Sequence, residues 1–335
     1  MTPRSPFELT RRDLLKALPM TAVAIAACDR PPYRPADFSV PRRSDVALLP
    51  AASYSVDLAD VISRGLDLLR PDVKGRTVLL KPNLVEYESG TIINTHPLVV
   101  AGAATAFLRA GASKVVVAEG PGHRRDMEYL LVATGLYDHL NDLRLTFVDL
   151  NLSDVHLTPL KSRFMALDQL ALPVDLLRAD FIVSLPKLKT HHWAGITAGM
   201  KNLFGVVPGA VYGWPKNLLH FHGIENAILD LAATVRPHFT IVDAVVAMEG
   251  DGPIMGTPRQ CGFLAMGSDV VAVDATCARL IGLDPAKIGY LSQAARFLGN
   301  TDPNRIDHRG ERPERYQTRF EVVDWFRDKR LAGGG

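Results

Sequence analysis

The sequence predicts an α/β fold in which a mainly parallel, doubly wound sheet carries helices on both faces. Short apolar runs with the length of strands alternate with longer runs in which apolar residues recur at helical spacing. Polar and glycine-rich segments follow several of the expected strands. In an open α/β sheet these segments lie at the carboxyl ends of the strands, where ligands bind. We therefore expect one site at that edge of the sheet.

The expected elements alternate along most of the chain. Gly111 follows the first expected helix directly, as a residue that ends a helix commonly does. At 47% hydrophobic residues, the 335-residue chain can bury a large core. Strands are expected at 76–81, 114–118, 145–150, 179–185, 239–242 and 262–266, and helices at 98–110, 127–137, 224–235 and 270–281.

The N-terminus has the form of an export signal. Arg11 and Arg12 precede an apolar run at 17–27, which is too short to span a membrane. The paired arginines resemble a twin-arginine signal, so the export machinery is an expected partner. The run ends in Ile-Ala-Ala before Cys28, which resembles a lipoprotein cleavage box with Cys28 as the acylated residue. Cleavage nearby that leaves a free Cys28 thiol is the open alternative.

These observations predict three parts of the chain and its location. They are a signal peptide at 1–27, a Pro- and Arg-rich tether at 28–49 and an α/β domain at 50–330. We expect the mature protein on the outer face of the cytoplasmic membrane or in the periplasm, held by a lipid anchor. Removing 1–27 takes away four basic and two acidic residues, so the formal charge falls from +2 to 0. A neutral domain gives no support to nucleic-acid binding.

Cysteine usage excludes one class of cofactor. After Cys28 the chain holds only Cys261 and Cys277, and no Cys-x-x-Cys pair. A cysteine-ligated iron–sulfur cluster is therefore not expected, and a metal would have to use His, Asp or Glu. A disulfide between Cys261 and Cys277 and two separate thiols both remain open.

The segment 184–209 is the most informative part of the chain. Pro186 is expected to end a buried strand and to begin a ligand-holding loop. Its lysines Lys187, Lys189 and Lys201 could hold an anionic group, and His191 could move protons or bind metal. An exposed, solvated basic loop is the alternative, but apolar residues are threaded between the charges of this segment.

Other strand ends add candidate residues. Lys81 and Asn83 follow the first core strand, and His123 follows the next in a glycine-rich turn that lacks the residues of a nucleotide-binding loop. Glu249 belongs to a carboxylate- and glycine-rich segment that suits a hard metal or a cationic group. For His123 a surface position, and for the segment around Glu249 a polar turn, are the open alternatives.

Several phrases together resemble the bacterial and archaeal family of the domain of unknown function 362. The resemblance spans about 74–285 and implies no agreed activity. Some relatives carry ferredoxin-type cysteines, which this chain lacks. The phrases are KPNLV from Lys81, THP from Thr95, LPKLKTH from Leu185, MKNLFG from Met200, VDAVVAMEGDGP from Val242 and SDVVAVDA from Ser268.

A remoter resemblance links 191–201 to the nickel-dependent lactate racemases. It implies that Lys201 carries a nickel-pincer nucleotide, that Thr197 contacts it and that His220 binds the metal. His191 and His123 would then be the acid and base. The chain departs from that pattern at Ala198-Gly199, where the racemases have a glycine pair, and at His220, which comes a few residues late.

Two classes of function follow. The first is an isomerase or oxidoreductase acting on a small carboxylate such as a 2-hydroxy acid, in which paired histidines exchange a proton and a bound cofactor takes up hydride. The cofactor is the nickel-pincer nucleotide or another metal cofactor. The second is a lipoprotein that captures a small anion or a metal and does no chemistry. Histidines that face one cleft favour the enzyme, because a binder needs only the cations.

Overall fold

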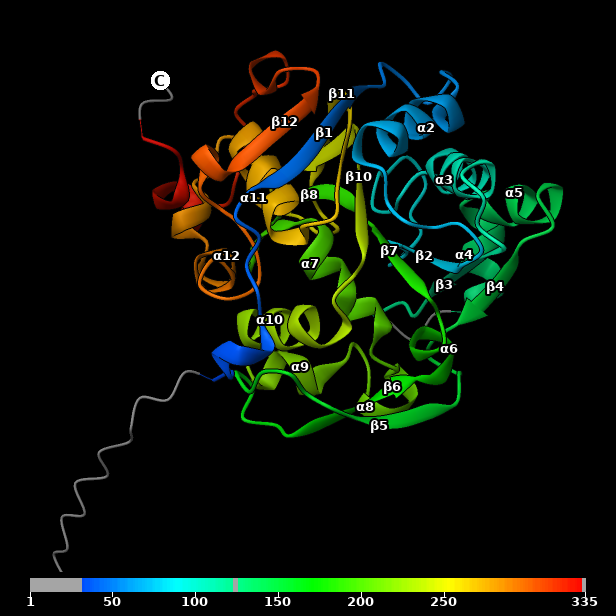
Figure 1. Ribbon diagram of the computed structural model, residues 1–335, viewed down its shortest axis with the longest axis horizontal. Helices are drawn as coiled ribbons and strands as arrows, with labels where there is room; N and C mark the ends of the chain where they lie inside the picture. Colours follow the sequence, from blue (N-terminus) through cyan, green and yellow to red (C-terminus); the bar gives the residue numbers. More distant parts are fainter. Residues whose placement is uncertain (1–31, 123–125, 333–335) are drawn as a thin grey trace, which may run out of the picture.

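The described residues of the computed structural model, 32–122 and 126–332, are organised around a ten-stranded sheet (Figure 1). Eight of these strands follow the spatial order β12-β1-β11-β10-β7-β2-β3-β4, and β8 and β9 continue from β10. A separate hairpin pairs β5 (Val155–Pro159) with β6 (Gln169–Pro173). The strands of the large sheet are β1 (Ser44–Pro50), β2 (Thr77–Pro82), β3 (Lys114–Glu119), β4 (Thr146–Asp149), β7 (Phe181–Leu185), β8 (Lys187–His191), β9 (Gly195–Thr197), β10 (Phe239–Glu249), β11 (Thr257–Gly267) and β12 (Ile306–Gly310).

The sheet is mostly parallel, as the sequence predicts. The run β10-β7-β2-β3-β4 is parallel throughout, whereas β11 is antiparallel to both of its neighbours. Strands of a parallel sheet are covered on both faces, so their sequences are apolar almost throughout. In β2, Val78 and Leu80 pack into one core and Leu79 into the other.

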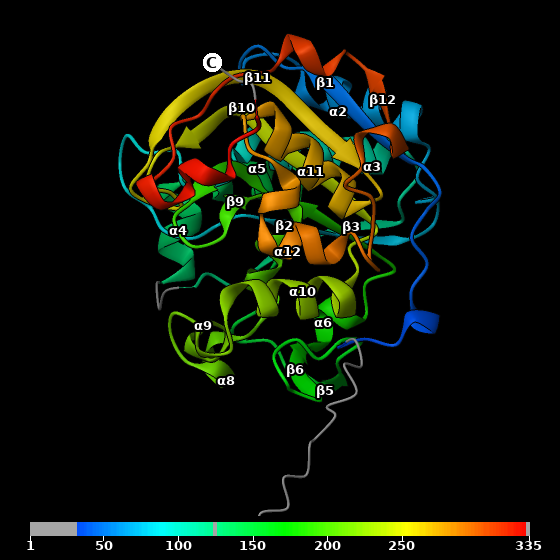
Figure 2. The same ribbon diagram turned by 90° about the vertical axis from the view of Figure 1, so that its left-hand side faces the viewer.

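Helices cover both faces and give three layers. The helices α2 (Leu58–Leu69), α3 (Pro97–Arg109), α4 (Met127–Ala133) and α5 (Leu136–Asp142) share one core with the sheet. The opposite core contains α7 (Gly199–Asn202), α10 (Ile224–Val235), α11 (Val270–Leu280) and α12 (Gly289–Ala294), and Figure 2 shows α10, α11 and α12 in front of the sheet. The doubly wound α/β prediction is confirmed. Three short helices, α6 (Val174–Leu177), α8 (Gly209–Tyr212) and α9 (Asn217–Phe221), lie beside the β5–β6 hairpin (Figure 1).

Two expected elements differ in extent. The helix expected at 127–137 is divided into α4 and α5, because Gly135 adopts a left-handed φ of 76° between them. The strands expected at 239–242 and 262–266 are the inner parts of the longer β10 and β11, which pair with each other through most of their length. The longer strands carry polar residues at their far ends, which an apolar run does not predict.

The tether is shorter than the sequence predicts. Residues 44–50 form β1, between β11 and β12, and Val46 and Leu48 are fully buried. Before β1, Tyr33 stacks on Phe297 with ring centroids 4.0 Å apart, so part of the Pro-rich stretch packs on the domain. The expected signal peptide, with Arg11 and Arg12, and the expected lipidation residue Cys28 lie outside the described residues. Within 32–122 and 126–332, no helix is both long and apolar enough to cross a membrane.

The segment 184–209 is structured and is not one long loop. After Pro186, β8 pairs with β10 and then turns back into β9, and α7 follows directly. The first turn of α7 is held by the buried carboxylate of Asp274, which accepts hydrogen bonds from the backbone N–H groups of Gly199 (2.6 Å) and Met200 (2.9 Å). This anchoring fixes the direction in which Lys201 and Asn202 leave the helix.

Candidate functional site

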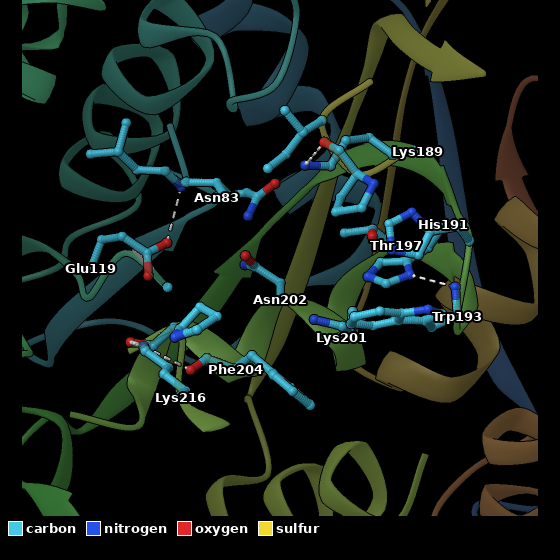
Figure 3. A pocket seen from close by; sticks show the side chains of 18 of the residues that line it. Asn83, Glu119, Lys189, His191, Trp193, Thr197, Lys201, Asn202, Phe204 and Lys216 are labelled. Atoms are coloured by element: carbon cyan, nitrogen blue, oxygen red, sulfur yellow. Dashed lines mark hydrogen bonds between the residues drawn. The ribbon is translucent and has the colours of Figure 1, made fainter. Parts of the chain in front are cut away.

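A cavity of about 380 Å³ opens beyond the carboxyl ends of β2 and β3 (Figure 3). Its other walls come from the β8–β9 hairpin, from α7 and the turn after it, from the segment before α9 and from the loop after β10. Figure 3 draws Asn83 and Glu119 on one side, Lys201, His191 and Trp193 on the other, and Asn202 between them. The described lining holds four lysines and two carboxylates, Lys81, Lys189, Lys201, Lys216, Glu119 and Asp251.

The floor of the cavity is a buried ion pair between Lys81 and Glu119. The Lys81 ammonium also donates to Asn202 Oδ1 (3.1 Å), and Glu119 accepts from the backbone N–H of Leu84 (3.1 Å). Gly205 lies directly against the pair, where a Cβ would come within 1.9 Å of Glu119 Oε1. Burial lowers the pKa of Lys81, and the neighbouring carboxylate opposes that shift. The pair joins β2, β3 and α7 at one point.

Lys216 and Lys189 are directed at backbone carbonyls. The Lys216 ammonium donates to the carbonyl oxygens of Gly120 (2.6 Å), Phe204 (3.0 Å) and Gly205 (3.2 Å), from a residue with a left-handed φ of 68°. Burial lowers its pKa to about 7. Three carbonyl acceptors favour the charged form, because only an ammonium supplies three N–H groups.

The Lys189 ammonium donates to the carbonyl oxygens of Ile93 (2.9 Å) and Pro253 (3.3 Å). It is fully buried. Burial, and next the nearby Lys201, lower its pKa well below the ordinary value. Lys189 therefore fixes the loop after β10 against the β8–β9 hairpin.

Lys201 is the lysine that the protein leaves uncommitted. Among the described residues it has no hydrogen-bond acceptor and no ion-pair partner, and its Nζ lies 3.7 Å from the centre of the Phe204 ring. Burial is the main cause that lowers its pKa to about 7, and the charge of Lys81 adds to the shift. A half-buried amine that faces the cavity and has no partner among the described residues is available to a ligand.

His191 and His220, the two described histidines of the expected site, differ in which ring nitrogen carries the proton. Nδ1 of His191 accepts hydrogen bonds from the backbone N–H groups of Trp193 (3.1 Å) and Ala194 (3.2 Å), so the ring proton is on Nε2. Burial lowers the pKa of His191 well below its ordinary value. His191 is therefore a neutral hydrogen-bond donor, and this geometry does not suit the acid–base exchange expected of it.

His220 has the complementary arrangement. Its Nδ1 lies 3.3 Å from the carbonyl oxygen of Lys216, which can only accept, so Nδ1 carries the proton and Nε2 keeps its lone pair. Burial, and next the charge of Lys201, lower the pKa of His220. A neutral ring with a free lone pair can take a proton or bind a metal.

Two buried polar atoms of the lining have no partner among the described residues. They are Oδ1 of Asn83 and Oγ1 of Thr197. Buried polar atoms are nearly always hydrogen-bonded, and an exception at a cavity indicates a ligand group or a water molecule. Asn83 and Thr197 thus add hydrogen-bonding capacity to the cavity.

The structure brings most of the predicted residues together. Glu249 does not line the cavity, because its carboxylate accepts from the backbone N–H of Glu321 (3.0 Å) and lies 3.6 Å from Arg259. His123 lies outside the described residues.

Sequence reasoning missed Asn202 and Lys216 as lining residues, and for Lys216 the pattern gives no signal because it follows no strand. The predicted residues that do line the cavity are Lys81, Asn83, Lys189, His191, Thr197, Lys201 and His220.

Lys187 is also absent from the lining, contrary to the prediction. Side chains alternate along a strand, so Lys187 and Lys189 share one face of β8, but β8 pairs irregularly with β10 and the two ammonium groups reach different surroundings. The Lys187 ammonium pairs with Asp243 (2.6 Å) and donates to Tyr54 Oη (2.7 Å). Both members of the ion pair are buried. Lys187 therefore fixes β8 to β10.

Three comparisons describe what the chain is similar to. A family model described as "Domain of unknown function (DUF362)" matches residues 78–279. The "Thylakoid-associated protein sll1697" of Synechocystis sp. is 32% identical over 235 residues, which cover 67% of this chain and 68% of that protein.

Two solved structures are similar in fold. The lactate racemase apoprotein from Thermoanaerobacterium thermosaccharolyticum aligns at 16% identity and a TM-score of 0.43, over 73% of this chain and 59% of that chain. A protein from Thermotoga maritima aligns at 15% identity and a TM-score of 0.37, over 66% of this chain and 57% of that chain. Both TM-scores lie below 0.5, and neither structure carries information on the activity of this chain.

The ion pair of Lys187 with Asp243 allows a test between a structural role and a ligand-binding role for Lys187. Lys187→Met should lower the free energy of unfolding by about 3–5 kcal/mol, because it leaves Asp243 buried without its partner. Urea denaturation followed by circular dichroism measures this change. Replacing Asp243 by Asn in the same chain should restore part of the loss, and Lys161→Met, at an exposed position, is the control. Unchanged stability with weakened anion binding would instead favour the ligand role expected from the sequence.

Proposed function

This chain belongs to the family of the domain of unknown function 362, and we propose that its cavity is the active site of an enzyme that acts on a small carboxylate. The observation that carries the proposal is the uncommitted Lys201. Lys81, Lys189 and Lys216 are each hydrogen-bonded to the protein, whereas Lys201 has no acceptor among the described residues. A half-buried cation among other cations is stabilised when an anion binds beside it.

Each remaining group has a role in this proposal. The Lys201 ammonium holds the substrate carboxylate, and the free oxygens of Asn83 and Thr197 meet a hydroxyl group on the neighbouring carbon. Nε2 of His220 accepts the proton of that hydroxyl, and Nε2–H of His191 donates a hydrogen bond to the substrate. This division of roles replaces the symmetric pair of histidines that the sequence suggests. It fits an oxidoreductase or isomerase that removes hydrogen from a 2-hydroxy acid.

Such chemistry needs an electron acceptor, which a bound cofactor would supply when present. For a nickel-pincer nucleotide or another metal cofactor, Nζ of Lys201 could instead be the attachment point and Nε2 of His220 the metal ligand. That assignment is the alternative to the roles given above, because an attached Lys201 cannot hold the carboxylate and a metal-bound Nε2 cannot accept a proton. Among the described residues there is no group of three or more His, Cys, Asp or Glu side chains that could hold a metal ion.

Peptide mass mapping of protein purified from its native host tests covalent attachment. A mass increase on the peptide that contains Lys201, together with nickel that is lost in His220→Ala, is the result expected for the nickel-pincer cofactor. An unmodified Lys201 in active protein would contradict attachment and leave Lys201 as the group that binds the carboxylate.

Anion binding should weaken as the pH rises through 7. Lys201 has a pKa of about 7, so it loses its charge between pH 6 and 8 while the carboxylate stays ionised. Isothermal titration with lactate as the probe, on protein with unmodified Lys201, measures this decline. At pH 6, Lys201→Met should bind lactate roughly tenfold to a hundredfold more weakly, because a charged hydrogen bond is lost. The affinity of Lys201→Met for lactate should also vary less with pH than the affinity of the wild type does.

The matched control for this experiment is Lys161→Met, which removes an exposed lysine outside the cavity. It should bind like the wild type at each pH. Equal affinity of Lys201→Met and wild type at pH 6 would exclude Lys201 from the anion site. Binding without turnover in the cofactor-loaded protein would instead support the second function, an anion-binding lipoprotein.

The location is also part of the proposal. The arginine pair and the box before Cys28 support export and lipid anchoring, and the relative in Synechocystis is named for its association with thylakoids. Exchange of Arg11 and Arg12 for lysine should keep the protein in the cytoplasm, and Cys28→Ala should release it from the membrane fraction. Cell fractionation with immunodetection measures both. Mature protein outside the cytoplasm in the double variant would refute the twin-arginine signal.

A further inference from the structure

One wall of the cavity is a succession of aromatic rings. The Phe204 ring lies 5.9 Å from the His220 ring, which lies 5.6 Å from the Trp193 ring, and Trp193 lies 4.7 Å from His192, between ring centres. All four residues line the cavity. Since Lys201 Nζ lies over the Phe204 ring, the wall begins at the uncommitted ammonium. From Phe204 the wall runs along the cavity through His220 and Trp193 to His192.

The other end of this wall is exposed and apolar. Trp193 is 59% exposed, and Met255, from the loop after β10, is 74% exposed. Single exposed apolar side chains are ordinary on a protein surface. Here both belong to the lining of the same cavity, together with Ile254 and Pro253. An apolar path therefore runs from the buried lysines to the surface.

The cavity is also larger than a three-carbon acid requires. Its volume of about 380 Å³ falls in the range of pockets that enclose drug-sized ligands. One water occupies about 30 Å³ in the liquid, so the space corresponds to about a dozen waters. An acid with six non-hydrogen atoms held by Lys201 and His220 would leave the outer part of the aromatic wall, at the exposed Trp193, without contact.

We infer that the ligand of this cavity is an amphiphilic acid, whose carboxylate lies at Lys201 and whose flat, aryl-type body lies along the wall formed by Phe204, His220 and Trp193. The inference rests on the proposed anion site and specifies its substrate class. The carboxylate of this ligand pairs with Lys201 at the inner end of the cavity, and the apolar body of the ligand covers the rings that face the cavity. Aromatic rings favour offset or edge contacts at centre separations of about 4.5–7 Å, the range already seen within this wall.

Two acids that carry the same carboxylate and hydroxyl groups test the inferred class of ligand. Lactate and 3-phenyllactate share the carboxylate and the hydroxyl and differ in one phenyl group. Isothermal titration on the full chain at pH 6 should give at least tenfold tighter binding of phenyllactate. In Trp193→Ala this advantage should shrink to about threefold or less, while lactate affinity stays unchanged. Phe221→Ala, which removes an 86% exposed ring outside the lining, should keep the full advantage.

The outcomes separate this inference from the proposed function. Equal affinities of the two acids in the wild type, with binding abolished in Lys201→Met, would overturn the amphiphilic ligand and leave the anion site intact. Tight phenyllactate binding that is insensitive to Lys201→Met but lost in Trp193→Ala would overturn the anion site. If neither acid binds to folded protein, both proposals fall. Met255→Ala provides a second test of the rim if Trp193→Ala does not fold.

Discussion

The site depends on the ion pair of Lys81 with Glu119. It joins the ends of two neighbouring parallel strands, and through Asn202 it also fixes α7. A buried pair is stable only if its remaining hydrogen-bonding groups are satisfied, and here backbone N–H groups and Asn202 meet that need. The close approach of Gly205 leaves no room for a side chain. Because the pair fixes α7 through Asn202, the neighbouring Lys201 is held at the wall of the cavity.

The lysines in and near the cavity show that the contacts of a side chain determine its role. Lys189 and Lys216 are directed at carbonyl oxygens, so their charges are held by the backbone and shape the cavity. Lys187 has a carboxylate partner and fixes strands. Lys201 has an aromatic face and no acceptor among the described residues, which leaves its charge for a ligand. Of these four chemically identical side chains, three are held by contacts within the protein and one has no hydrogen-bond acceptor among the described residues.

Apolar runs predict the sheet and its active edge because parallel strands are buried on both faces. Lys81 and Asn83 were found in this way, since Lys81 lies at the carboxyl end of β2 and Asn83 follows that strand directly. The same reasoning misplaced Lys187, whose partner Asp243 lies on a different strand, 56 residues further along the chain. It also missed Lys216, which reaches the site from a segment without periodicity. Contacts between segments distant in sequence depend on register and bulges, which composition does not encode.

The histidines show a second limit of sequence reasoning. The sequence assigns proton transfer to His191 and metal binding to His220, but the role of each ring depends on which nitrogen is already bonded. Backbone N–H groups of the hairpin turn occupy Nδ1 of His191 and hold it as a donor, whereas a carbonyl oxygen occupies Nδ1 of His220 and leaves its Nε2 free. His191 can therefore only donate a hydrogen bond from Nε2, whereas His220 has a lone pair at Nε2. Of these two rings, only His220 is arranged to accept a proton.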